Sequence, residues 1–450
     1  MIMRKMFRTF VAVCLLHTLL VVSVHAQDTL KLDLKQVLEV GLSTSPTIKI
    51  ADKQLKRVDY SNKEKYAGLF PNISGSASYQ RALQKQRAFF DIPGMPSNPD
   101  GFEMGQDNTF VGGISASLPL IAPTLWATIR MNESEMQLVA ETARSSKIAL
   151  YNQLTKTYYA ILFAQDSYKV FESNYKNSAQ SAQIIADKYK LGAVSEFEFL
   201  RADVQLRSAL TNLISAQSAI DVSMMQLKSL MGVEMTTELI IIGNLKDLEK
   251  NMYADVLNVE ANQLENNSDL KQLDIRTEQM KRTWDVQRAN WFPTLAASIN
   301  YQYMAMANDD VKMKDYRWFP NSNAGISLNV PIFQGGARYY KGKQLKLQME
   351  EIGLQKQSLK NSIELQANTY VDNMKKLIDK IESNKKGLEQ AEKALAISTK
   401  MYQVGAATFL DQSNSELALL QAGLSYNQSV FDFLSTKADL EKLLGNTFNN

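Results

Sequence analysis

The chain has 450 residues, with 50 Lys and Arg against 47 Asp and Glu, two histidines and one cysteine. Cys14, His17 and His25 all lie before Gln27. The remainder therefore lacks the side chains that most often act as general acids and bases, nucleophilic thiolates or transition-metal ligands. We predict neither an enzyme nor a metal or cofactor site, with a carboxylate-based hydrolase as a distant alternative. The balanced charge, without a basic cluster, also argues against a nucleic-acid partner.

Residues 1–26 have the pattern of a secretory signal peptide. Three basic residues, Arg4, Lys5 and Arg8, precede an apolar run that ends near Val24. The sequence VHA at 24–26 is a plausible cleavage site. An uncleaved membrane anchor is the alternative, but the apolar run is short for a membrane span. We therefore expect export across the inner membrane, and a mature chain of zero net charge.

The first structural repeat is expected over 27–232. Its helical pattern begins near Leu32 and stops before the FP pair at 70–71, where the apolar period changes from 3.6 to two. The connection between the two strands is rich in Pro, Gly and Asp. The elements predicted after the opening helix are a β-hairpin over 71–119, a long helix over 124–190 and a returning helix over 197–231.

A linker over 233–253, with an apolar patch LIII at 239–242, leads to a second copy of the same unit over 254–445. When the chain is aligned with itself, YKLG at 189–192 falls on YQVG at 402–405. A duplication of this size predicts one fold built twice. After an opening helix, the predicted elements are a β-hairpin over 293–331, a long helix over 337–403, a helix over 409–444 and a C-terminal tail over 446–450.

The four predicted strands have one apolar and one polar face. Leu295, Ala297 and Ile299 alternate with Ala296 and Ser298, for example. Strands of about ten residues can cross an outer membrane when tilted, but four strands cannot close a barrel. Other copies of the chain must then pair with the open edges, three copies giving twelve strands and two giving eight. The alternative is a soluble hairpin that packs on helices.

Several stretches together resemble the TolC-type outer-membrane efflux protein family, over nearly all of the mature chain. They are LDLKQVLEVGL at 32–42, FPNI at 70–73, FPTL at 292–295, VPIFQGG at 330–336, YQVGAATFLD at 402–411 and LLG at 443–445. The resemblance implies a mainly α protein with membrane β-structure, in which the duplicated units form a long α-helical barrel and one third of a trimeric twelve-stranded β-barrel. It implies an outer-membrane channel of a tripartite efflux or type I secretion system.

The implied partners are two further copies of the chain, outer-membrane lipid, a periplasmic adaptor protein and, through it, an inner-membrane pump. The resemblance places adaptor docking at the turns between the long and the returning helices. The matching residues are Leu191, Gly192, Ala193, Ser195, Val404, Gly405, Ala406 and Thr408. Ordinary turn chemistry is the alternative, because glycine caps many helical hairpins. A soluble periplasmic coiled-coil scaffold remains the alternative function.

An acidic residue follows each glycine by six positions, Glu198 in the first repeat and Asp411 in the second. The resemblance implies that these acids line the periplasmic gate, where a ring of carboxylates would favour cations. Acids that merely stabilise a helix N-terminus are the alternative. Ala407 and Asn414 stand where the best-known pattern has an arginine and a second aspartate. We therefore expect gate closure to depend on helix packing around Leu410, Leu417 and Leu424 instead.

Overall fold

The computed structural model describes residues 30–89, 99–249 and 264–445. The expected signal peptide, the C-terminal tail and the start of the second repeat lie outside these ranges. The chain divides into two compact units, and each unit takes segments from both sequence repeats. The first unit comprises residues 1–49, 146–266 and 363–450, and the second comprises 50–145 and 267–362. Each compact unit therefore combines the corresponding parts of the two repeats, and neither unit coincides with one repeat.

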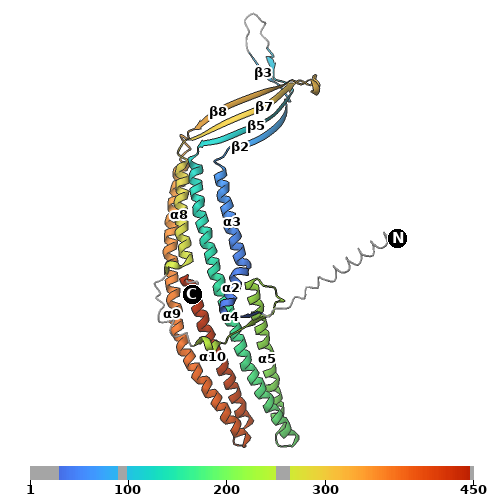
Figure 1. Ribbon diagram of the computed structural model, residues 1–450, viewed down its shortest axis with the longest axis vertical. Coiled ribbons are helices and arrows are strands. Elements are labelled where there is room, and N and C mark those ends of the chain that lie inside the picture. Colours follow the sequence, from blue (N-terminus) through green and yellow to red (C-terminus); the bar gives the residue numbers. More distant parts are fainter. Residues whose placement is uncertain (1–29, 90–98, 250–263, 446–450) are drawn as a thin grey trace, which may run out of the picture. The chain divides into compact units, whose positions relative to one another are not determined.

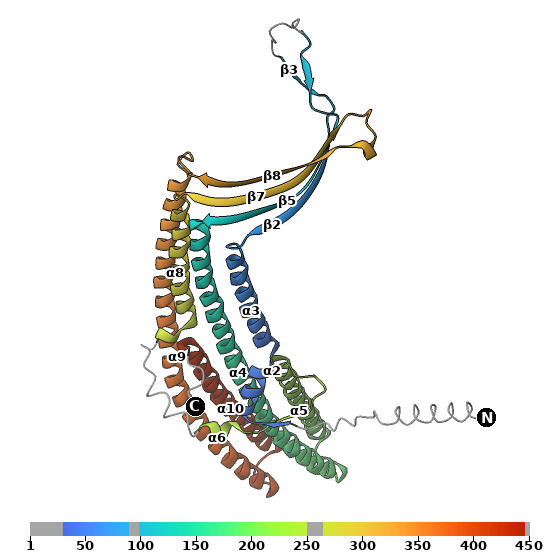
Figure 2. The ribbon, with the colours of Figure 1, turned by 45° about the horizontal axis from the view of Figure 1, so that its top comes forward.

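The second unit contains a four-stranded antiparallel sheet joined to helices (Figures 1 and 2). The strands lie in the order β2-β5-β7-β8, so the two hairpins of the repeats are neighbours in one sheet. Their bounds are Asn72–Arg81 for β2, Asn108–Ile121 for β5, Thr294–Ala307 for β7 and Trp318–Asn329 for β8. Most of α3 (Pro46–Ala67), the whole of α8 (Ser268–Ala289) and the first parts of α4 (Pro123–Lys190) and α9 (Ala337–Gln403) complete the unit.

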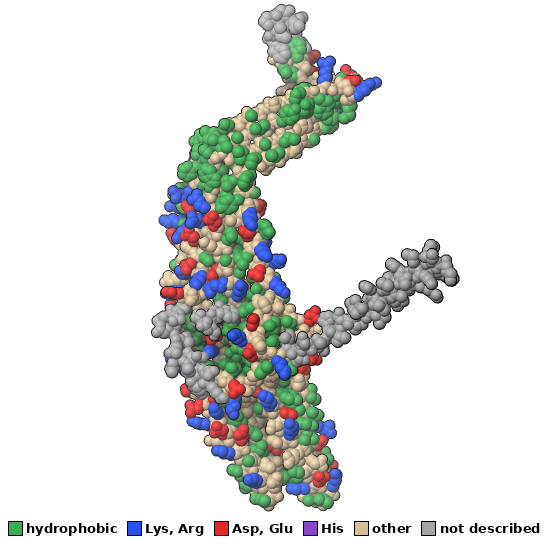
Figure 3. Space-filling model, viewed as in Figure 1, with side chains coloured by type: hydrophobic (Ala, Val, Ile, Leu, Met, Phe, Trp, Pro, Cys, Tyr) green, Lys and Arg blue, Asp and Glu red, His purple; other side chains and the backbone are tan. Residues whose placement is uncertain are grey.

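The strand register gathers apolar side chains on one face of the sheet. Leu295 pairs with Leu328, and Ala297 pairs with both Ile326 and Leu118. The other face carries polar pairs, such as the hydroxyls of Ser74 and Ser115 at 2.9 Å. Figure 3 shows hydrophobic side chains over the sheet. The alternation in the sequence therefore corresponds to two chemically different faces.

The first unit consists of long antiparallel helices and a small parallel sheet. Its helices are α2 (Leu34–Thr44), α5 (Glu196–Met231), α10 (Phe409–Leu444) and the remaining parts of α4 and α9. Strand β1 (Leu30–Leu32) pairs in parallel with β6 (Leu239–Ile241), and α6 (Leu245–Glu249) and the 3-10 turn η1 (Leu264–Asn266) follow. Within the described ranges, no helix has both the length and the apolar composition needed to cross a bilayer.

Two features of the first unit differ from the sequence prediction. The opening helix is broken at Ser45, whose ψ of 133° is not helical. The break occurs because proline, here Pro46, disfavours the helical conformation of the residue before it. The apolar patch at 239–242, expected to be linker, supplies strand β6. That strand pairs with β1 at the opposite end of the first repeat, a partnership that a local pattern cannot reveal.

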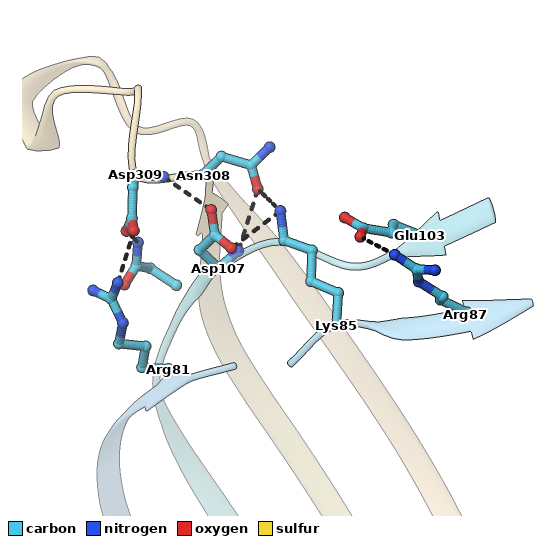
Figure 4. A network of polar contacts seen from close by, with 8 residues as sticks. Arg81, Lys85, Arg87, Glu103, Asp107, Asn308 and Asp309 are labelled. Carbon is cyan, nitrogen blue, oxygen red and sulfur yellow. Dashed lines mark hydrogen bonds and ion pairs between the residues drawn. The ribbon is translucent and has the colours of Figure 1, made fainter. Parts of the chain in front are cut away.

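Short strands and a 3-10 turn lie in the two connections between strands, at the end of the large sheet that is farther from its helices. Strands β3 (Gln86–Ala88) and β4 (Phe102–Met104) form an antiparallel pair within the first connection, and the 3-10 turn η2 (Met313–Asp315) lies within the second. Figure 4 shows the polar network between these connections. Arg81 Nη2 lies 2.7 Å from Asp309 Oδ2, and Lys85 Nζ lies 3.0 Å from Asp107 Oδ1. The network therefore ties the hairpin of one repeat to that of the other.

Candidate functional site

The two turns predicted as docking sites have the same backbone geometry. Gly192 and Gly405 adopt φ values of 70° and 75°, the left-handed conformation that favours glycine. The N–H of Ala193 donates to Lys188 O at 2.8 Å, and that of Ala406 donates to Met401 O at 2.8 Å. Each turn is a Schellman motif, which satisfies the last carbonyls of the long helix. The duplication therefore extends to the individual hydrogen bonds.

Residues on either side of each glycine divide into exposed apolar side chains and helix caps. Leu191 is 84% exposed and Val404 is 79% exposed. Ala193 and Ala406 are exposed as well. Ser195 and Thr408 are the N-caps of α5 and α10, and their side chains accept from the N–H groups of Glu198 and Asp411. All eight predicted docking residues thus lie in two short turns, and two large apolar side chains there face solvent.

The ends of the two helical hairpins pack on one another within the first unit. Ile185, Ala202 and Phe409 form a buried cluster, with Phe199 and Tyr402 at its border. Lys188 Nζ lies 4.4 Å from the centre of the Tyr402 ring, a cation–π contact between the two repeats. The turns are therefore held together as one surface.

The two acids predicted at the gate lie in the first turns of α5 and α10. Asp411 Oδ2 accepts from Thr408 N at 2.9 Å and from Thr408 Oγ1 at 2.6 Å, which completes a reciprocal capping box. These two hydrogen bonds from Thr408 lower the pKa of Asp411 below its ordinary value. Glu198 has the equivalent position, and its N–H donates to Ser195. Both acids hold the third position of their helices, and the Asp411 carboxylate caps the start of α10. A role at a gate remains a prediction.

The leucines expected to close the gate do not form the buried seam of α10. Leu410 and Leu417 are exposed within the chain, and Leu424 is half-buried. The buried seam near the turn consists instead of Phe409, Gln412 and Glu416. These residues follow a spacing of three and four, which is the spacing of a coiled-coil seam.

Glu416 is a buried acid that the sequence prediction missed. It is 2% exposed, and its carboxylate accepts from Ser181 Oγ at 3.0 Å, Gln412 Nε2 at 3.2 Å and Gln205 Nε2 at 3.1 Å. Among the described residues no Lys or Arg forms an ion pair with it. Burial raises its pKa, against the opposing effect of the hydrogen bonds from Ser181 and Gln412. The seam spacing could have identified the position, but not its partners on α4 and α5.

The two turns and their surroundings lack the ligands of a catalytic metal. In the parts of the chain that the structure describes, no group of three or more Cys, His, Asp or Glu side chains could hold a metal ion. The arrangement instead offers an exposed apolar surface at the two turns, two acids beside it and a buried polar network behind it.

Comparison with known proteins identifies the family. The pattern of the outer membrane efflux protein family matches residues 37–233 and 261–446. The outer membrane protein TolC of Vibrio cholerae is 18% identical over 333 residues, which cover 74% of this chain and 76% of TolC. The alkaline protease secretion protein AprF of Pseudomonas aeruginosa is 20% identical over 380 residues, covering 84% of this chain and 77% of AprF.

Solved structures show the same fold. The CmeC outer membrane channel of Campylobacter jejuni superposes with a TM-score of 0.69 at 19% identity, covering 92% of this chain and 85% of CmeC. The outer membrane protein VceC of Vibrio cholerae gives a TM-score of 0.69 at 17% identity, covering 92% of this chain and 97% of VceC. The family match spans most of both repeats, and the chain therefore belongs to the outer membrane efflux protein family, with a fold of TolC type.

Proposed function

We propose that three copies of this outer-membrane efflux channel close a twelve-stranded barrel, and that their helices continue it as a periplasmic tunnel. The observation that carries the proposal is the pair of open sheet edges. Within the described residues, β2 and β8 each pair with a single neighbouring strand, and both are exposed along their whole length. Unpaired backbone groups are costly in lipid, so the edges of one copy would pair with those of the next.

The tunnel would end at the turns around Gly192 and Gly405, where the adaptor protein would dock. The exposed Leu191 and Val404 would provide apolar contacts, and Glu198 and Asp411 would contribute six carboxylates to the narrow end of a trimer. An inner-membrane pump, reached through the adaptor, would supply the energy. The chain itself would perform no chemistry, and its outer-membrane location disfavours the alternative of a soluble periplasmic scaffold.

Oligomeric mass and cross-linking across the sheet edges test the trimer. The chain after residue 26 has no cysteine, so Ser76→Cys on β2 can be combined with single cysteines placed in turn along β8. We expect trimeric mass in detergent, and covalent dimers and trimers under oxidation for at least one β8 position. Cysteines on β2 and on the central strand β7 provide the control, because the closed barrel keeps those strands apart. A monomeric particle in detergent would contradict the proposal.

Site-specific photo-crosslinking in cells tests adaptor docking independently. A photoreactive residue in place of Leu191 or Val404 should capture an adaptor protein, identified by mass spectrometry. The matched control is Ile214, an apolar side chain of α5 that is also exposed but lies five turns from the glycine. Equal capture from position 214 and from the turns would refute docking at the turns.

A further inference from the structure

A basic and aromatic pocket lies between α8 and α9, beside the end of the large sheet in the second unit. The cavity has a volume of about 230 Å³ and is lined, among others, by Trp284, Arg288, Trp291, Arg338, Lys343 and Lys346. A side chain at Gly342 would meet the Trp284 ring at 2.8 Å, so the glycine allows this ring to pack across α9. The pocket is therefore shaped by specific residues of both helices.

The positive charge of this pocket has no acidic partner within the described part of the chain. None of Arg288, Arg338, Lys343 and Lys346 forms an ion pair with a carboxylate there. Arg338 is only 7% exposed. A buried cation without a counter-charge is costly, so an anion bound in the pocket would stabilise Arg338.

The contacts of Arg338 leave it available to such an anion. Its Nε donates to Gln334 Oε1 at 2.9 Å and its Nη1 donates to Pro331 O at 3.3 Å, both neutral acceptors. Its guanidinium carbon lies 5.2 Å from the centre of the Trp291 ring. These contacts orient the side chain without neutralising it.

The surroundings of the pocket indicate the kind of anion. Trp291, Phe292, Ile332 and Phe333 are exposed apolar side chains between the sheet and the helices. In Figure 3, Lys and Arg side chains gather on the helices next to the hydrophobic surface of the sheet. Aromatic side chains followed by basic ones are typical of a membrane interface, where the aromatic rings lie at headgroup level and the cations meet lipid phosphates.

We propose that this pocket binds the phosphate headgroup of an anionic phospholipid in the periplasmic leaflet of the outer membrane. Arg338 and Arg288 would hold the phosphate, Lys343 and Lys346 would add charge at the entrance, and the acyl chains would lie along the apolar face of the sheet. The cavity is smaller than the roughly 300–1,000 Å³ typical of pockets for drug-sized ligands, which suits a headgroup. The inference rests on the proposed function, because it requires the sheet to cross the membrane.

Native mass spectrometry of the full chain in neutral detergent tests the proposal. The protein is titrated with phosphatidylglycerol, with zwitterionic phosphatidylcholine of the same acyl chains, and with inorganic phosphate as a competitor. We expect phosphatidylglycerol to bind several-fold more tightly than phosphatidylcholine. The double variant Lys343→Gln/Lys346→Gln should weaken phosphatidylglycerol binding by about tenfold, since each basic side chain attracts an anionic lipid.

The variant Lys53→Gln/Lys56→Gln is the matched control. It removes the same charge from exposed positions of α3 in the same unit and should keep the lipid preference. Equal binding of both lipids, an unchanged preference in the Lys343/Lys346 variant, or full competition by inorganic phosphate at equimolar concentration would each overturn the proposal. The same spectra report the oligomer. A trimer without lipid preference refutes the pocket alone, whereas a monomer with the preference refutes the trimeric channel alone.

Discussion

Replacing Glu416 should reveal whether a buried carboxylate holds the end of the helical bundle together. Three donors converge on this side chain, from Ser181 on α4, Gln205 on α5 and Gln412 on α10 itself. Glu416→Ala would leave the donors of Ser181 and Gln205 without this acceptor, whereas Gln412 Nε2 also donates to Ser181 Oγ at 3.1 Å. A buried donor that loses its partner costs about 1–3 kcal/mol. Since water can enter the space left by the side chain, we expect a loss at the lower end of that range for each of these two donors, about 2 kcal/mol in all.

Glu416→Gln should behave differently, because it removes the charge and keeps the size. An amide oxygen at this position can accept from Ser181 and Gln412. Gln205 must then turn its own amide so that its oxygen faces the new amide nitrogen, and Ser413, which now donates to that oxygen at 2.7 Å, can instead accept through its hydroxyl. We therefore expect a change within about 1 kcal/mol, the usual net value of one hydrogen bond.

The pH dependence of local stability should also differ between the wild type and Glu416→Gln. Because burial raises the pKa of Glu416, the folded chain keeps this proton at pH values where the unfolded chain has lost it. The stabilising contribution is complete below the ordinary value of 4.5, decreases as the pH rises through the raised pKa, and is constant above it. The amide variant should lack this decrease.

Hydrogen–deuterium exchange of peptides covering residues 405–420 measures these effects locally. A loss of about 2 kcal/mol in Glu416→Ala corresponds to roughly 30-fold faster exchange where opening is local. Glu392→Gln, which neutralises an exposed acid of α9, is the control and should leave exchange unchanged. If Glu416→Ala exchanged like the wild type, or if Glu416→Gln kept the pH dependence of the wild type, the reasoning about this network would be wrong.

Further predictions concern the turns and the gate. Gly405→Ala places a side chain at φ 75° and should destabilise the turn by about 1 kcal/mol. Gly353→Ala, at a position of α9 with open space around it, should stabilise the helix by up to about 1 kcal/mol. Thermal unfolding followed by circular dichroism measures both effects. Glu198→Gln/Asp411→Asn should lower the cation preference of single channels in planar bilayers, and Lys at both positions should reverse it. Because hydrogen bonds from Thr408 lower the pKa of Asp411, its share of the cation preference should persist to pH values below 3.8. A higher open probability with unchanged ion preference would instead identify the two acids as locks.

Local chemistry made most of the elements predictable from sequence. Gly192 and Gly405 end the long helices because glycine readily adopts the left-handed conformation of the turn. Ser195 and Thr408 cap the returning helices because their hydroxyls accept from backbone N–H groups three residues later. Both effects involve only neighbouring residues. The two-residue period of the strands likewise reflects which face is apolar, a property of each strand alone. The turns at Gly192 and Gly405 could therefore be predicted from the local sequence, whereas Ser195 and Thr408 were predicted as docking residues and their capping role was not identified.

Features that depend on distant partners could not be predicted. The parallel pair β1–β6 exists only because the start of the first repeat meets the linker that follows this repeat. Glu416 resembles an ordinary surface acid until Ser181 and Gln205 are known to face it. Leu410 and Leu417, predicted to pack at the gate, are exposed within one chain, and the buried stripe of α10 contains Gln412 and Glu416. Packing of these leucines between copies stays a prediction.

The residues buried along α10 differ between its two ends, and this difference should affect where the helix opens most easily. After Phe409 at the turn, the buried positions are Gln412, Glu416 and Gly423, whereas toward the other end they include Phe433 and Leu440. The Oε1 atom of Gln412 is buried and has no hydrogen-bond partner among the described residues. Buried polar groups contribute less net stability than close-packed apolar side chains, so the free energy of local opening should be lowest over this polar stretch. The weakest packing of the seam therefore lies directly behind the apolar cluster that holds the two turns together. A partner that binds the turns would then move them as one surface, with the polar stretch as the part of the seam that opens most easily.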